Sequence, residues 1–412
     1  MTGQLDPKDA QWAAEQAARW SYGRLLSVLA ARDRDIAAAE DALSEALLVA
    51  LRVWPETGVP LNPEGWLLTT ARNRRKNDAR AQSVRRAAEP DLIRRFDTSH
   101  DDAPVGDDRL KLMFVCAHPA IDPAARAPLI LQTVLGIDAG TIGKAFLVEP
   151  AAMSQRLVRA KSRIRDAGLR FAIPEPADLP ERLGAVLDAI YAAFGQGWDS
   201  LDTPDAPDAL TGEAIWLARL VAEQMAEEPE PKGLLALMLY CSARRRARRD
   251  ANGRFVPLDR QDAGLWDRTR IIEAEGLLTA AARAGRFGRY QCEAAIQSVH
   301  IQRPITGHLN LSALRALYDL LVSKSDSIGA RISRAVVLAE QGQVADALDE
   351  LAVLPMERVK RYQPWWVARS RCASLAGQTD LAAEALSVAI SLTEDAAVRT
   401  FLLEQLQSLK SG

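Results

Sequence analysis

Four cations gather on one face of a helix that the sequence predicts from residue 63 onward. Asn62 suits the N-cap, and Pro63 suits the first helical position because its missing N–H has no partner there. At 100° per residue the apolar arc of this helix contains Trp66, Leu67, Leu68 and Ala71. Its basic face contains Arg72, Arg75, Lys76 and Arg80. Such a helix is anchored in a core by one side and offers cations to a polyanion with the other, although many basic faces are only solvated.

A second group of cations lies on a helix predicted at 150–165, which follows a short helix at 138–146 and a tight turn. Its buried face is predicted to contain Met153, Leu157, Ala160 and Ile164, which recur at helical spacing. An adjacent polar face contains Gln155, Arg156, Arg159 and Arg163. A short helix, a tight turn and a longer basic helix form the helix-turn-helix arrangement, whose second helix enters a major groove. The pattern fits an ordinary helical hairpin equally well.

A third predicted helix, at 36–54, combines acidic and apolar residues. Its acidic residues are Glu40, Asp41 and Glu45, and its apolar residues Leu43, Leu47, Leu51 and Trp54 recur at helical spacing. The segment 55–60 contains two prolines and a glycine, which end this helix before the basic one begins.

The charge of the 412-residue chain is unevenly distributed, although the net value is only −2. Residues 1–172 carry 25 basic against 22 acidic side chains, and the remainder is acidic. Within the first part, residues 72–95 hold nine cations against three anions, and residues 156–170 hold six against one. Two separate basic blocks suggest two contacts with one long polyanion.

The sequence lacks the motifs of common catalytic sites. It has four histidines and contains no Walker loop, GxSxG or HExxH pattern, so we expect neither an enzyme nor a bound cofactor. Cys116 and His118 have no second Cys/His pair nearby, and we therefore predict a buried thiol beside a structural histidine rather than a metal site. Scattered cysteines, no signal peptide and no apolar run of ~18 residues predict a cytoplasmic protein without a membrane span.

Composition and periodicity predict an all-α, multidomain protein. The expected parts are a helical domain at 8–82, a polar linker at 83–107, a helix-turn-helix unit at 108–170, a helical extension at 178–288 and helical repeats at 289–412. The extension contains one dense polar cluster, formed by Asp250, Arg254, Gln261 and Asp262. It is either a turn with capping side chains or a contact that fixes the extension against the two basic units.

The final part of the chain contains two similar stretches, QGQVADALDEL at 341–351 and AGQTDLAAEAL at 376–386. Gly342 and Gly377 are 35 residues apart, close to the ~34-residue period of tetratricopeptide repeats. The repeats are expected either to bind an unknown protein or ligand or to act as a helical spacer.

Together these motifs resemble the extracytoplasmic-function sigma factors of bacterial RNA polymerase. AEDALSEA at 39–46, WP at 54–55 and WLLTTARN at 66–73 resemble region 2 of that family, and GTIGKAFLV at 140–148 with MSQRLVRAK at 153–161 resembles region 4. LPERL at 179–183, LLALML at 234–239, QD at 261–262, WD at 266–267 and YQ at 290–291 resemble the subgroup with a long C-terminal extension ending in tetratricopeptide-like repeats.

The resemblance implies partners and a role for each motif. Asp41, Glu45, Leu47 and Leu48 would dock on the clamp coiled coil of the largest subunit of RNA polymerase core, and region 4 would meet the flap of the second-largest subunit. The −10 element of promoter DNA would be bound as it opens by Asn62, Trp66, Arg72, Arg75, Lys76 and Arg80. The −35 duplex would be bound by Gln155, Arg156, Arg159 and Arg163.

The chain departs from the family at three positions, and two other functions remain open. Ser44 stands where the family usually has Gln, Leu47 where it usually has Phe, and Ala117 where a Cys is frequent. The alternatives are a stand-alone helix-turn-helix regulator, which would bind duplex DNA unaided, and a repeat-based adaptor, which would need neither basic block.

Overall fold

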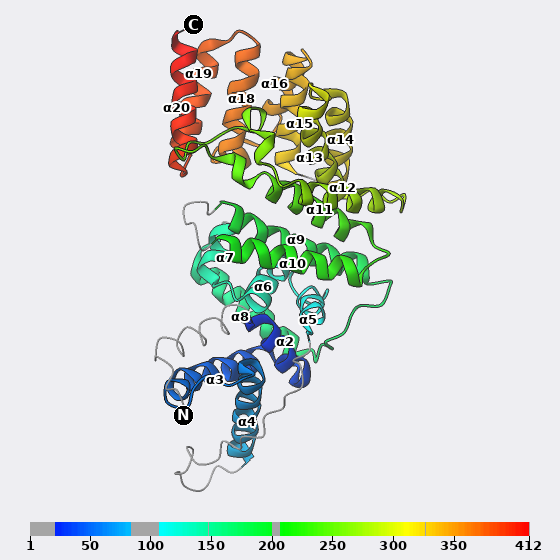
Figure 1. The fold of residues 1–412 in the computed structure, drawn as a ribbon, viewed down its shortest axis with the longest axis vertical. Helices are drawn as coiled ribbons and strands as arrows, with labels where there is room; N and C mark the ends of the chain where they lie inside the picture. Colours follow the sequence, from blue (N-terminus) through cyan, green and yellow to red (C-terminus); the bar gives the residue numbers. More distant parts are fainter. Residues whose placement is uncertain (1–20, 84–106, 147, 200–206, 326, 412) are drawn as a thin grey trace. The chain divides into compact units, whose positions relative to one another are not determined.

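The computed structural model describes residues 21–83, 107–146, 148–199, 207–325 and 327–411. These residues form α-helices, a few single 3-10 turns and one isolated antiparallel bridge between Arg249 and Phe255 (Figure 1). The predicted all-α fold class is therefore confirmed.

The chain divides into two compact units, Met1–Leu217 and Ala218–Gly412. The division falls inside helix α10 (Pro207–Gln224), whereas the sequence predicts a domain limit near residues 170–178. The predicted domain limits remain predictions. The physical reason for the later division is the packing of the helix that follows residue 178, described below.

The first unit begins with three helices, α2 (Tyr22–Asp33), α3 (Ile36–Thr57) and α4 (Pro63–Ser83). Asp35 caps α3 by accepting the N–H of Ala38 at 3.1 Å. Asn62 caps α4 as predicted, since its side chain accepts the N–H of Gly65 at 2.9 Å. The buried side chains of α2 and α3 pack against each other and against α4, so these three helices share one apolar core.

Four further helices follow in the first unit: α5 (Arg109–Cys116), α6 (Pro123–Leu135), α7 (Ala139–Ala145) and α8 (Pro150–Asp166). Asp122 caps α6, which starts with Pro123, and α6 ends at Gly136 in the left-handed conformation with φ +66°. Helix α2 packs on both α5 and α6, which joins this set to the preceding three helices.

Helix α9 (Leu179–Asp199) also belongs to the first unit, because it packs on α6 and α5. The buried Arg182 donates from Nε and Nη2 to the carbonyl oxygen of Phe114, at 3.1 and 2.5 Å. Arg126 of α6 pairs with Glu181 at 2.7 Å. The first helix of the predicted extension is thus built into the helix-turn-helix part.

The second unit is a succession of antiparallel helices. After the last residues of α10, it contains α11 (Pro229–Ala243), α12 (Arg268–Ala282) and α13 (Arg289–Thr306), with α11 buried on nearly all sides. The remainder, shown from yellow to red in Figure 1, consists of α14 (Leu311–Lys324), α15 (Ile328–Glu340), α16 (Val344–Ala352), α17 (Met356–Val359), α18 (Gln363–Leu375), α19 (Thr379–Ser391) and α20 (Ala396–Ser411).

The two similar stretches form the same turn in this second unit. Gly342 and Gly377 have φ of +87° and +73°, between α15 and α16 and between α18 and α19. The following glutamines donate their N–H groups to Leu338 and Ala373, at 3.0 and 2.9 Å. The equivalent turns, with small buried residues such as Ala339 and Ala373 beside them, make the two hairpins structural repeats.

We expect Arg182→Met to destabilise the first unit, because the C-terminal carbonyl of Phe114 in α5 loses its partner. The free energy of unfolding should fall by about 1–3 kcal/mol. Hydrogen exchange at the amides of α5 and α9 should therefore accelerate by roughly tenfold for each 1.4 kcal/mol lost. Arg170→Met is the matched control, since Arg170 is exposed. Equal exchange in the two variants would show that α9 is only loosely attached.

Candidate docking and nucleic-acid interface

The polar face of α8 is open to solvent. Met153, Leu157, Ala160 and Ile164 are buried, as the spacing predicts. Gln155, Arg159 and Arg163 are exposed on the other side, and Arg156 is half-buried beside the carbonyl oxygen of Ala124 at 3.4 Å. All four predicted −35 residues therefore lie on α8 outside its buried face, where three cations are placed within two helical turns.

The turn before α8 is tight, and a glycine makes it possible. The N–H of Val148 donates to the carbonyl oxygen of Gly143 at 2.8 Å, and a Cβ on Gly143 would lie 2.6 Å from the carbonyl oxygen of Val148. At the other end of α7, the hydroxyl of Thr141 donates to Asp138 at 2.6 Å, and this bond with two N–H bonds holds the pKa of that carboxyl below its usual value. The short helix, turn and longer helix have the arrangement predicted from the sequence.

Helix α3 presents an outward face of mixed character. Asp41 is exposed, and Leu48 and Leu51 are 55% and 42% exposed although both are leucines. Leu47 is half-buried. Glu45 is also on the surface, where Arg74 of α4 pairs with it at 2.6 Å. The four predicted docking residues are therefore all accessible to some degree, and Leu51 adds an apolar side chain that the prediction did not include.

The predicted −10 residues are only partly within the described part of the chain. The side chain of Asn62 is engaged as the helix cap. Trp66 is half-buried and packs edge-on against Trp54, with ring centroids 5.4 Å apart. Arg72 is half-buried, whereas the side chains of Arg75, Lys76 and Arg80 lie outside the described residues, although α4 continues through them.

One cation of the second basic block is not on the outward face at all. Lys161 of α8 pairs with Glu40 of α3, with Nζ 2.5 and 2.7 Å from the two carboxylate oxygens. The two side chains are only 11% and 17% exposed. Helical periodicity could have predicted that Lys161 faces inward. On a helical wheel, position 161 is adjacent to the buried positions 157 and 164 and points away from 159 and 163.

Cys116 and His118 both have local partners. The Cys116 thiol lies 3.5 Å from the hydroxyl of Thr133, and burial raises the pKa of this thiol to about 12, so it stays protonated. His118 accepts the N–H of Ala120 at 3.1 Å. Within the described ranges, no group of three His, Cys, Asp or Glu residues is arranged to hold a metal ion.

The polar cluster of the extension forms a local turn in the second unit. Asp250 accepts the N–H groups of Asn252 and Arg254 at 2.8 and 2.9 Å, and Asp262 accepts that of Gly264 at 2.8 Å. Gln261 donates to the carbonyl oxygen of Val256 at 3.2 Å. The residues on either side of this turn, Arg249 and Phe255, contact α20 and its start. Arg249 pairs with Asp395 at 2.5 Å, and the ring centroids of Phe255 and Phe401 are 5.4 Å apart. The proposed contact with the basic units stays a prediction.

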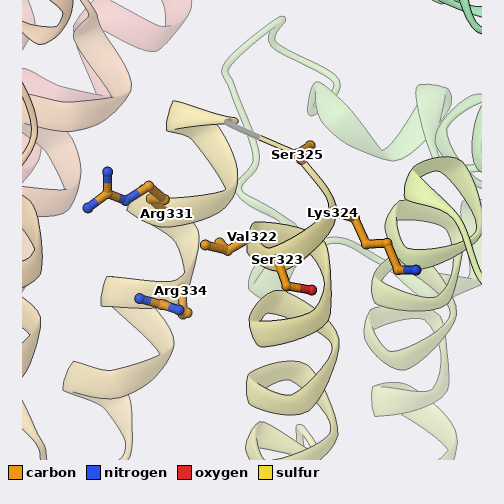
Figure 2. A pocket seen from close by; sticks show the side chains of 6 residues that line it. All are labelled: Val322, Ser323, Lys324, Ser325, Arg331 and Arg334. Carbon is orange, nitrogen blue, oxygen red and sulfur yellow. The ribbon is translucent and has the colours of Figure 1, made fainter.

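A shallow pocket in the repeats has a basic lining but does not form an anion site. It lies where α14 meets α15 and has a volume of about 430 Å³. Figure 2 shows Arg331 and Arg334 on one side and Lys324 pointing away from them. Arg334 also pairs with Glu350 at 2.6 Å and with Asp319 at 3.4 Å, which neutralises part of the charge. The cations do not converge on one point.

Comparison with known proteins assigns the chain to a family. It is 36% identical over 385 residues to a protein of Rhizobium meliloti (strain 1021) described as uncharacterized, with 91% of each chain covered. The chain belongs to the family of that Rhizobium protein. Residues 182–282, from α9 to the end of α12, match the model of DUF6596, a family of unknown function. No solved structure matches the chain.

In the part of the chain that the structure describes, no helix is both long enough and apolar enough to cross a bilayer.

We expect Gly143→Ala to distort the turn before α8, because the new methyl group would collide with the backbone of Val148. Relieving this collision should cost about 1–3 kcal/mol and tilt α8 away from α7. Hydrogen exchange of the α7 and α8 amides and the thermal unfolding of the chain measure the effect.

The matched control for this variant is Gly184→Ala. A Cβ at Gly184, inside α9, would have no atom within 4 Å, so this change should stabilise the helix by about 0.5–1 kcal/mol. If both variants were equally stable, the close approach at Gly143 would not constrain the turn.

Proposed function

We propose that this protein is a sigma factor of the extracytoplasmic-function class, which directs bacterial RNA polymerase core to promoters in the cytoplasm. The observation that carries the proposal is the pairing of two accessible surfaces in the first unit. One is the acidic and apolar outward face of α3, formed by Asp41, Glu45, Leu48 and Leu51. The other is the basic outward face of α8, which follows a tight turn.

The chemistry of the α3 face fits a protein partner. Leu48 and Leu51 occur one turn apart beside Asp41 and Glu45. When a partner covers exposed leucines of this kind, the burial of their apolar surface stabilises the complex. The neighbouring carboxylates favour a basic partner and orient it. Polymerase core, through its clamp coiled coil, is the partner that we propose for this face.

The chemistry of the α8 face fits duplex DNA. Arg159 and Arg163 project from consecutive turns, and Gln155 lies one turn before Arg159. Arginine can bind guanine edges with two hydrogen bonds, and glutamine can do the same with adenine, while either can also contact phosphates. We propose that this face binds the −35 element and that α4 binds the opening −10 element. In this function the protein performs no catalysis of its own.

The extension after residue 178 is proposed to regulate these surfaces from within the same chain. Its first helix, α9, is attached to α5 and α6 by Arg182 and by the pair of Arg126 with Glu181. A change in the extension would therefore act directly on the helices that support α8. We propose that the repeats bind another protein or a ligand. They follow α9 in the same chain, and α9 is attached to α5 and α6.

We expect Leu48→Glu to weaken binding to core polymerase by at least tenfold. A leucine covered by a partner contributes about 1.5–3 kcal/mol, and each 1.4 kcal/mol is a factor of ten in Kd. Leu48 is 55% exposed, so the folded protein should tolerate the charge. The measurement is the Kd of purified protein and core polymerase, together with promoter-dependent transcription.

Ile272→Glu provides the control, because it introduces the same charge on α12, away from the α3 face. Ile272 is 72% exposed, so the folded protein should tolerate this change as well. It should bind polymerase as the unchanged protein does. If the two variants bound core polymerase with equal affinity, α3 would not be the docking surface. If the protein without substitutions did not bind core polymerase, the proposed function would be refuted.

We expect Arg159→Ala to lower the affinity of the polymerase complex for a promoter by about 1–3 kcal/mol if Arg159 contacts a base edge. The loss should then be present on a promoter with an intact −35 element and absent when that element is scrambled. Arg165→Ala, an exposed cation of the same helix that pairs with Asp166 at 3.1 Å, should have a smaller effect. The same loss on both promoters would instead assign Arg159 to phosphate contact.

A further inference from the structure

The segment between α11 and α12, residues 244–268, carries an excess of positive charge. It contains eight arginines, no lysine and four aspartates. The whole second unit, residues 218–412, has 26 basic and 23 acidic side chains, so its net positive charge comes from this one segment. A concentration of arginine is typical of surfaces that bind phosphate groups, because the planar guanidinium can donate two parallel hydrogen bonds.

Backbone hydrogen bonds make this segment one compact structure. Residues 249–255 form a short hairpin that is closed by the isolated antiparallel bridge. The N–H of Val256 donates to the carbonyl oxygen of Arg248, and that of Asp267 donates to Ala243 at the end of α11, both at 2.9 Å. The first and third of its 3-10 turns pack on each other. The three turns are η1 (Arg245–Arg248), η2 (Leu258–Arg260) and η3 (Ala263–Leu265).

Half of the eight arginines are exposed and have no ionic partner. They are Arg246 of η1, Arg254 of the hairpin, Arg260 of η2 and Arg268 at the start of α12. None of these four side chains forms an ion pair or a hydrogen bond with another residue that the structure describes. By contrast, the exposed Arg371 of α18 is paired with Glu340 at 2.8 Å.

The four aspartates of the segment do not neutralise these arginines by pairing with them. Asp250 and Asp262 accept N–H groups of their own turns, and Asp267 caps α12 by accepting the N–H of Arg270 at 3.2 Å. Asp259 is exposed. The carboxylates therefore fix the conformation of the loops, while the four guanidinium groups stay available to a partner.

Arg254 and Arg260 line one hollow between the hairpin and α20, with a volume of about 430 Å³. Two free guanidinium groups beside one hollow can bind neighbouring phosphates of a nucleic-acid strand. The carboxylates of Asp250 and Glu404 also line the hollow. That of Asp250 accepts two N–H groups, whereas Glu404 is exposed and would repel an anion.

The character of this surface favours a nucleic acid over a protein as its partner. Within 244–268, all of which the structure describes, Leu265 is the one large apolar side chain that is exposed, at 49%. Interfaces between proteins have an apolar centre, whereas interfaces with DNA are more polar and strongly positive. The repeated phosphates of a duplex can also reach arginines that lie on separate turns.

We propose that the segment 244–268 binds the phosphate backbone of duplex DNA through Arg246, Arg254, Arg260 and Arg268. This contact goes beyond the proposed function, because it needs neither polymerase nor a −35 sequence. The two are compatible, since DNA bound to α8 would be held at a high effective concentration for the second unit of the same chain. Phosphate contacts carry no sequence information, so this surface adds affinity without changing the choice of promoter.

The test measures binding of the full-length chain to a fluorescent duplex of random sequence, without polymerase. Fluorescence anisotropy gives the Kd at several salt concentrations. Arg254→Ala combined with Arg260→Ala should raise the Kd about tenfold or more near ~0.1 M salt. It should also lower the slope of log affinity against log salt by about 1.8, because each phosphate contact contributes about 0.9. Adding Arg246→Ala and Arg268→Ala should double this loss of slope.

Two control variants separate a local contact from an effect of overall charge. Arg283→Ala combined with Arg361→Ala removes the same charge from exposed positions elsewhere in the second unit, and should change the Kd and the slope much less. Glu404→Gln should act in the opposite direction and lower the Kd, because it removes a repulsive carboxylate from the hollow. Circular dichroism and thermal unfolding verify that each variant is folded.

A second measurement locates the hairpin on the DNA independently of affinity. A DNA-cleaving iron chelate is attached at Asn252→Cys, at the exposed tip of the hairpin, with the half-buried Cys241 replaced by alanine. The bound protein should then cut the duplex. The same chelate at Ala345→Cys, an exposed position on α16, should cut it much less.

The outcomes distinguish this contact from the sigma-factor proposal. Unchanged Kd and slope in the folded double and quadruple variants, or equal cutting from the two labelled positions, overturns the DNA contact. If the quadruple variant binds DNA normally but loses affinity for core polymerase, the segment docks on an acidic protein surface and the DNA contact is wrong. If the slope falls as expected while the unsubstituted chain does not bind polymerase, the DNA contact stands and the sigma-factor proposal is refuted.

Discussion

The close packing of α2 is the constraint on which the first unit depends. This twelve-residue helix contacts α3, α4, α5 and α6, and its buried hydrophobic side chains are Leu25, Leu26, Leu29 and Ala30. Gly23 lets its first turn touch the backbone of α6. Ser21 and Arg24 both bond to Glu64, which ties the start of α4 to the same helix. Helix α3 also packs directly on α8, which is a second contact between the two helical sets.

The arrangement around α2 explains how surfaces of opposite character coexist in one small body. The apolar stripes of α3 and α8 are both turned inward, so their charged stripes must face solvent. Asp41 is accessible on one helix and Arg159 on the other. The exception is the pair of Glu40 and Lys161, in which each helix contributes one charge to the interior. Each of these two charges loses its hydration on burial, so the pair is compensated only while both partners are present.

The second unit differs from the first, because it is an array of short helices that stack as hairpins. Each hairpin exposes an apolar face that it cannot bury alone, and stacking against the next hairpin covers it. Trp365 shows the principle, because its ring is 1% exposed and its indole N–H donates to the carbonyl oxygen of Leu351 at 3.2 Å, in the preceding hairpin. The left-handed glycines at 342 and 377 reverse the chain in the same way twice.

Local sequence determined much of this structure. The cap at Asn62, the proline starts of α4 and α8, the buried stripe of Met153 and Ile164, and the repeated turns all follow from short-range rules of helix geometry, which depend on residues within one or two turns. Helical periodicity also placed Arg159 and Arg163 on an outward face correctly.

Only the tertiary structure decided which charges are free and which helices belong together. Lys161 is one of six cations in its block, yet a glutamate 121 residues away removes it from the surface. Arg74 pairs with Glu45, and Arg182 ties α9 to the helix-turn-helix part, where the composition suggested a boundary. The physical reason is that burial and ion pairing depend on distances between segments remote in the chain. Periodicity specifies the faces of a helix, but the partner that covers each face is specified by three-dimensional packing.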